Sequence, residues 1–109
     1  MLDEKQLKDM LNSRLVPVVV DGTHPDVQLP AHLKDNPSIL LKLSQIFQQP
    51  MDEEYEDTGI RVTLSFNQEP YRCFLPYEAI WATMEPDGSM AIYCMPQREQ
   101  LQWIQQQLI

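Results

Sequence analysis

Few side chains in this sequence are of the types that perform catalysis or bind metals, and they are far apart along the chain. His24 and His32 are the only imidazoles, and Cys73 and Cys94 are the only thiols. A zinc site requires closely spaced ligands, and a nucleophile requires an activating partner or a signature such as G-x-S-x-G, which Ser65 and Cys73 lack. We therefore expect no catalytic residue, no metal ligand, no cofactor and no enzyme activity. The alternative is a hydrolase that depends on His24 or His32.

The charge of the chain argues against several classes of partner. Its net charge is −8, because 16 acidic residues outnumber 8 scattered Lys and Arg residues. Such a surface repels nucleic-acid phosphates and anionic lipid. The opening MLDEKQLKDM has neither a basic start nor an apolar core, and no apolar run approaches the roughly 20 residues that cross a bilayer. We expect a cytoplasmic protein that contacts no membrane, with nucleic acid an unlikely partner and both cysteines reduced and buried.

The strand pattern favours a protein that binds a partner through the shape of its surface. After Gly59, apolar residues alternate with polar ones over residues 60–66, the period of a half-buried antiparallel strand. The turn residues 67–70 and the run 71–75 then predict a hairpin. Thr63 and Ser65 lie on the polar face of the first strand, where small side chains leave room for a peptide.

The remaining elements predict one small, mostly β domain. Residues 18–20, 38–44 and 89–94 read as further strands, while residues 78–84 fit either a short helical turn or a strand. The acidic run 52–57 predicts an exposed loop that Tyr55 anchors. A chain of 109 residues is long enough for one core.

A helix is expected at each end of the chain. Asp3 is placed to cap the first helix, with Gln6 at the capping-box position. An apolar stripe on this helix either packs on the chain's own sheet or pairs with a second copy; its members are Leu7, Met10, Leu11 and Leu15. Near the C-terminus, after Pro96, the expected apolar face consists of Leu101, Ile104 and Leu108, with Trp103 off it.

A valine strand followed by a proline-punctuated segment is the most distinctive stretch of the chain. Its pattern VVDxTxPxVQxP is carried by Val19, Val20, Asp21, Thr23, Pro25, Val27, Gln28 and Pro30. A second pattern follows at matching spacing: a strand with Phe66, a turn with Pro70, and Leu75-Pro76 before a segment of small residues. Together, over roughly residues 7–93, they resemble the stringent starvation protein B family, adaptors that bring tagged substrates to the ClpXP protease.

The resemblance implies an α+β fold with a small, strongly bent, Sm-like β-barrel. It implies a single domain over residues 1–109, with the first helix in 1–15, the barrel in 16–94 and a helix or docking segment in 95–109. Members bind the trans-translation (ssrA) degradation tag, so the expected peptide-binding residues are Thr63, Leu64, Ser65, Phe66, Leu41, Leu43, Met90 and Ile92. Each apolar member of this set can equally be ordinary core. N-terminal helices of the family pair across a two-fold axis, which implies a homodimer through Leu7, Met10, Leu11 and Leu15.

The C-terminal part departs from the family pattern. Well-known members end in a long acidic tail whose last residues dock on ClpX, whereas this sequence finishes QREQLQWIQQQLI. Either the last helix covers the barrel, or a different docking element is formed by Trp103, Ile104, Leu108 and Ile109. Two other functions stay open: an adaptor for other peptide signals, and a Sm-like RNA-binding protein, which the negative charge disfavours.

Overall fold

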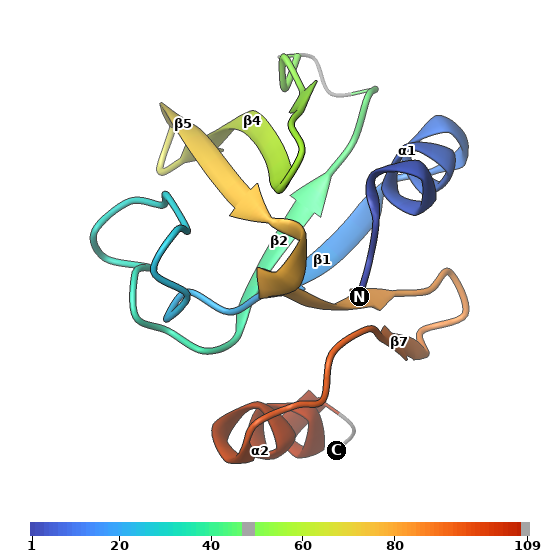
Figure 1. Cartoon of the computed structure of the whole chain (residues 1–109), viewed down its shortest axis with the longest axis vertical. Helices are drawn as coiled ribbons and strands as arrows, with labels where there is room; N and C mark the ends of the chain where they lie inside the picture. The colour runs from blue at the N-terminus through green and yellow to red at the C-terminus, as the bar shows by residue number, and fades with distance from the viewer. Residues whose placement is uncertain (47–49, 108–109) are drawn as a thin grey trace.

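A computed structural model describes residues 1–46 and 50–107 as two antiparallel sheets and two helices (Figure 1). The elements follow in the order α1 (Glu4–Ser13), β1 (Val16–Val20), β2 (Ile39–Leu43), β3 (Glu54–Tyr55), β4 (Gly59–Phe66), β5 (Glu69–Pro76), the 3-10 turn η1 (Tyr77–Ala79), β6 (Ile80–Met84), β7 (Met90–Ile92) and α2 (Arg98–Gln107). The predicted α+β class is confirmed. Within these two ranges, neither helix is long and apolar enough to cross a membrane.

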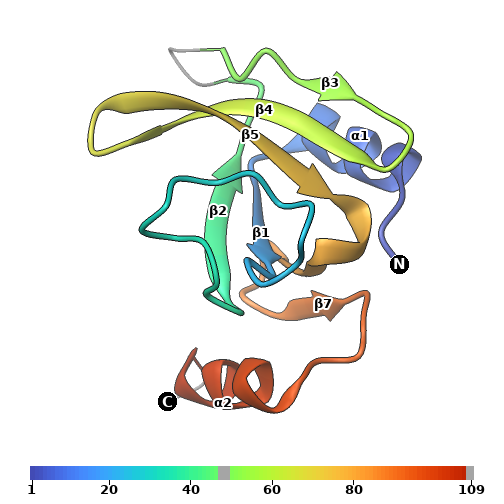
Figure 2. The same ribbon diagram turned by 60° about the vertical axis from the view of Figure 1, so that its left-hand side comes forward.

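The strands form two separate sheets. The larger has the order β2-β1-β6-β7, and the smaller has the order β3-β4-β5. Figure 2 shows the β4–β5 hairpin running across the direction of β1 and β2. Because β2 and β7 each have one strand neighbour, the strands of the described residues do not close into the expected barrel.

The valines of β1 are buried on both faces of the larger sheet. Val18 and Val20 lie in the main core with residues of β2, β4 and β5, whereas Val19 lies in a second apolar cluster on the opposite face. A strand covered on both sides is apolar at successive positions, which explains the unbroken valine run.

A β-bulge in β6 creates the second cluster. Val19 of β1 pairs with Ala82, but the next residue, Val20, pairs with Ile80, so Trp81 is the extra residue. As a result Trp81 and Ala82 both join Val19 in the outer cluster, while Ile80 joins the main core. Residues 78–84 were expected to form either a short helical turn or a strand, and the structure contains both: η1, followed by the bulged strand β6.

Helix α1 begins as its sequence predicts. The Asp3 carboxylate accepts from the Gln6 N–H at 2.8 Å, and the Gln6 side chain accepts from the Asp3 N–H at 3.0 Å. Leu7 and Leu11 are buried in the main core, so the apolar face of the helix packs on the chain itself.

Tyr55 is half-buried and packs against the main core, and the Lys8 ammonium lies 4.6 Å from its ring centre. The expected exposed loop over residues 52–57 is wrong in part, because Glu54 and Tyr55 form the short strand β3.

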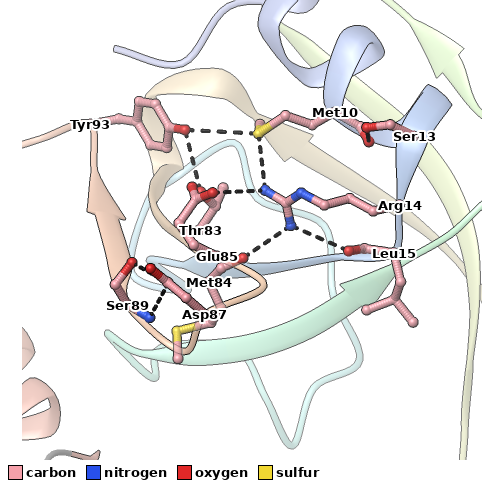
Figure 3. A network of polar contacts seen from close by, with 10 residues as sticks. All are labelled: Met10, Ser13, Arg14, Leu15, Thr83, Met84, Glu85, Asp87, Ser89 and Tyr93. Carbon is pink, nitrogen blue, oxygen red and sulfur yellow. Dashed lines mark hydrogen bonds and ion pairs between the residues drawn. The ribbon is translucent and has the colours of Figure 1, made fainter.

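Polar contacts bind the end of α1 to β6 and β7 (Figure 3). The Arg14 guanidinium donates to the Met84 carbonyl at 3.1 Å and lies 3.4 Å from the Glu85 carboxylate. The Met10 sulfur accepts from Arg14 and from the Tyr93 hydroxyl, at 3.6 and 3.9 Å. This network joins segments about 70 residues apart in the chain.

Helix α2 covers the outer face of the larger sheet. The rings of Trp103 and Trp81 meet edge to face with centres 6.0 Å apart, and Ile104 packs in the same cluster. The buried Gln100 amide and the Trp81 indole N–H both donate to the Pro37 carbonyl, at 3.1 and 3.2 Å. The prediction that Leu101 lies on the packed face of α2 is wrong, because Leu101 is 49% exposed. The bulge in β6 places Trp81 against Trp103, so the helix packs through Trp103 instead.

The proline-punctuated segment connects the two sheets. The Asp21 carboxylate accepts from the Thr23 N–H at 2.9 Å, and the Gln28 backbone exchanges two hydrogen bonds with Phe74 of β5. Gly22 permits the close approach, because an added Cβ would lie 2.7 Å from the Asn36 carbonyl oxygen. The residues of the first family pattern thus stabilise a connection between β1 and β5.

The β4–β5 turn offers a test of backbone strain. Asn67 and Gln68 have φ angles of 52° and 69°, in the left-handed region that Gly adopts freely. We expect Gln68→Gly to raise the free energy of unfolding by about 1 kcal/mol, measured by urea denaturation. The control Gln105→Gly, at an exposed position of α2, should lower it by about 1 kcal/mol. Destabilisation by Gln68→Gly would contradict the turn geometry.

Candidate functional site

A groove of about 500 Å³ lies between β2 and the second half of β4. Five of its lining residues are apolar and three are polar, and none carries a carboxylate. They are Leu40, Leu41, Lys42, Pro50, Thr63, Leu64, Ser65 and Phe66. The volume is in the range of sites that bind small ligands or short peptide segments.

The groove exists because the β4–β5 hairpin is longer than the strands on which it packs. Each hairpin strand has eight residues and β2 has five, and in Figures 1 and 2 the turn extends past β2. Burial on the inner face of β4 falls toward the turn: Val62 is fully buried, Leu64 is 9% exposed and Phe66 is only half-buried. The end of the hairpin therefore leaves apolar surface beside β2.

Strand edges border the groove. Among the described residues, β2 pairs only with β1, so every second residue of β2 directs its main-chain groups away from the sheet. On β4, the short strand β3 pairs with Ile60 and Arg61, and the Thr63 N–H donates to the Met51 carbonyl at 2.6 Å. A chain lying in the groove would run beside the outer edge of β2.

Among the described lining residues Lys42 is the one cation, and a second cation, Arg72, contacts the lining residue Thr63. Lys42 is exposed and makes no ion pair within the described ranges, although acidic residues outnumber basic ones overall. Arg72 of β5 donates to the Thr63 hydroxyl at 3.0 Å and lies 2.6 Å from the Glu54 carboxylate. Arg72 thus orients Thr63, while Lys42 leaves one positive charge for a ligand.

The structure brings five of the eight expected peptide-binding residues to this groove: Leu41, Thr63, Leu64, Ser65 and Phe66. It places the other three elsewhere. Leu43 is fully buried in the main core. Met90 packs in the outer cluster and Ile92 is exposed, both on β7, at the edge of the larger sheet opposite β2.

Three lining residues were not anticipated from the sequence: Leu40, Lys42 and Pro50. The alternation of buried and exposed residues along β2 could have indicated Leu40 and Lys42. Ile39, Leu41 and Leu43 are buried and Leu40 and Lys42 are exposed, so the polar Lys42 marks the outward face that Leu40 shares. Pro50 follows an undescribed segment, and no local pattern points to it.

Several residues that were expected to contact other proteins instead pack within the protein itself. Leu7 and Leu11 are buried and Met10 is half-buried, whereas Leu15 is 36% exposed. The half-buried Trp103 and Ile104 pack on the larger sheet. Leu108 and Ile109 lie outside the described residues.

The residues considered first for catalysis do not gather in one place. His24 lies 2.6 Å from the Glu78 carboxylate and its other ring nitrogen accepts from the Asp26 N–H. His32 meets the ring of Phe66. Within the described residues, no group of three or more His, Cys, Asp and Glu side chains is placed to hold a metal ion.

Comparison with protein-family models and with curated proteins gives no match for this chain. The resemblance to the stringent starvation protein B family therefore depends on the two sequence patterns alone. What the geometry adds is the groove between β2 and β4, which several residues of the expected site line.

The two thiols differ in their surroundings, which predicts different reactivity. Burial raises the pKa of Cys73, on β5, to about 12, while Cys94 is half-buried. Because the thiolate is the nucleophile, Cys94 should react with Ellman's reagent near pH 8, and Cys73 only after unfolding in guanidinium chloride. Cys94→Ser should leave a folded protein that does not react. Loss of the fast reaction in Cys73→Ser instead would contradict this assignment.

Proposed function

We propose that this protein is a non-enzymatic, cytoplasmic adaptor of the stringent starvation protein B family that binds the ssrA degradation tag and delivers tagged proteins to ClpXP. The observation that carries the proposal is the groove between β2 and β4, lined by Leu41 and by Thr63 to Phe66. The finer Sm-like character of the fold is part of this proposal. An adaptor for another peptide signal would use the same groove.

The binding mode we propose is addition of an extended peptide beside β2. The outer edge of β2 provides main-chain donors and acceptors over five residues, about 17 Å of extended chain. Main-chain hydrogen bonds of this kind give affinity without regard to side chain. Specificity then comes from the side chains that meet the apolar and hydroxyl groups of the groove.

Charge makes the groove suitable for an acidic peptide despite the acidic protein. Lys42 has no ion pair in the described part of the chain, and no carboxylate lines the groove. A peptide carboxylate near Lys42 gains attraction that is absent from the acidic surface elsewhere. An exposed pair of this kind contributes more to the association rate and to specificity than to affinity.

Delivery follows from holding the substrate near the unfoldase. Tethering makes capture nearly intramolecular, with effective concentrations up to about millimolar for short linkers. Because Trp103 and Ile104 pack on the larger sheet, contact with ClpX through α2 would use the exposed side of that helix or require its displacement.

A peptide titration tests the proposal. Fluorescence anisotropy should show saturable binding of the host's own tag peptide and none of a scrambled peptide. Ser65→Arg fills the groove with a long side chain; this steric block outweighs the attraction between the added charge and an acidic peptide, so binding should weaken by about tenfold or more. Ser13→Arg, an exposed Ser at the end of α1, is the matched control and should bind as the wild type does. Absence of binding by a folded wild-type protein would reject the tag-adaptor function.

The homodimer is a second part of the proposal with its own test. Since Leu7 and Leu11 are buried in the chain's own core, a two-fold contact through this region would use the exposed side of α1 and Leu15. Multi-angle light scattering should give the mass of a dimer for the wild type and of a monomer for Leu15→Glu. Leu101→Glu, at a similarly exposed leucine of α2, should remain a dimer. A monomeric wild type would contradict dimerisation.

A further inference from the structure

Two hydrogen-bond donors face the sulfur of Met10 (Figure 3). Met10 lies in the last turn of α1, and the guanidinium of Arg14, just past the helix, is 3.6 Å from its sulfur. The hydroxyl of Tyr93, just past β7, is 3.9 Å from the same atom. A thioether sulfur is only a weak acceptor, so both donors meet an atom that holds them poorly.

The other contacts of these two donors leave room for a better acceptor. The nitrogen of Arg14 that meets the sulfur lies 3.4 Å from the Glu85 carboxylate, longer than the roughly 2.7–2.9 Å of a strong charged hydrogen bond. The Thr83 hydroxyl is 3.3 Å from the Tyr93 hydroxyl and can donate to it, which leaves the Tyr93 O–H for Met10. Both donors can therefore form stronger bonds if an oxygen replaces the sulfur as their acceptor.

Met10 is also within reach of small reagents in solution. It is half-buried, although its side chain packs against the main core. Met1 and Met95 are 71% and 91% exposed, whereas Met51 is 2% exposed and its sulfur lies 3.3 Å from the Ser44 N–H. Because oxidation of a thioether follows its exposure, Met1 and Met95 provide references for fast oxidation and Met51 for a thioether that the fold shields.

We propose that Met10 is an oxidation site, at which a hydroperoxide converts the thioether to a sulfoxide that ties α1 more firmly to the β6–β7 hairpin. The sulfur gives an electron pair to the outer oxygen of the hydroperoxide, and the O–O bond breaks. The hydrogen on the transferred oxygen passes to the departing oxygen, which leaves as water or an alcohol. The sulfur is thereby oxidised and the hydroperoxide reduced. Neither the reaction nor its effect requires the adaptor function.

The surroundings of the new oxygen decide whether it stabilises the fold. Sulfoxide formation usually weakens a core, because it places a polar group among apolar side chains. At Met10 the oxygen instead lies between the Arg14 guanidinium and the Tyr93 hydroxyl, and a hydrogen bond to a charged group contributes more than a neutral one. Because Arg14 also donates to the Met84 carbonyl of β6, a stronger contact at Met10 holds the end of the helix to both strands of the hairpin.

Peptide mass spectrometry tests the site itself. Folded protein treated with hydrogen peroxide should oxidise first at Met1 and Met95 and then at Met10, whereas Met51 should react only after unfolding in urea. A Met10 thioether that resists peroxide for as long as Met51 does would overturn the proposal.

Urea denaturation tests what the sulfoxide does to the fold. Peroxide should raise the urea midpoint of the wild type by about 0.5 M more than that of Met10→Leu, which retains the other methionines and both cysteines. In Tyr93→Phe, which lacks one donor, this gain should fall by about half. Treatment of the oxidised wild type with methionine sulfoxide reductase should remove the gain. An unchanged or lower midpoint after oxidation of Met10, or a full gain in Tyr93→Phe, is incompatible with the proposal.

Discussion

The valines of β1 must be covered on both faces of their strand, because Val18 and Val20 point to one side and Val19 to the other. One side is filled by the inner faces of β2, β4 and β5 and by α1. The other is filled by α2, through the tryptophan that the bulge of β6 turns outward. Both faces of β1 are therefore covered, whereas Leu40 and Lys42 on the outward face of β2 stay exposed. The groove accordingly lies at β2, the edge strand of the larger sheet, and not over the covered strand β1.

A second consequence comes from unequal strand lengths. Residues near the start of β4 pack on the core, whereas those near the turn extend beyond β2 and are progressively less buried. Extending a hairpin in this way exposes apolar surface, which is costly unless another group covers it. Natural proteins generally shorten or protect such edges. That this hairpin retains Leu64, Phe66 and Tyr71 on one face is why we interpret its end as a binding surface.

Local features of this fold could be predicted from the sequence, and non-local ones could not. The capping box at Asp3 and Gln6 and the alternation over β4 are encoded within a few residues, and both appear as expected. The order of strands is set by contacts between distant segments, so the sequence did not reveal that β7 lies at the opposite edge from β2. The inward face of α2 likewise depends on the bulge at Trp81, which no pattern around Trp103 reports. For the candidate site, the alternation predicted strand β4 and its two faces, and the family resemblance predicted that Thr63 to Phe66 belong to the site. Met90 and Ile92 were expected there too, but they lie away from the groove on β7.

The contact between Trp81 and Trp103 has a practical consequence for optical spectroscopy. These are the only two tryptophans in the chain, and their rings lie edge to face across the junction of α2 with the larger sheet. Two indoles this close are expected to couple their electronic transitions, so the folded protein should show a circular dichroism couplet that is lost when the rings separate. Every tryptophan signal therefore originates at this single junction, far in the fold from the hairpin tip. The tryptophan pair thus reports, without any added label, whether α2 is packed on the larger sheet.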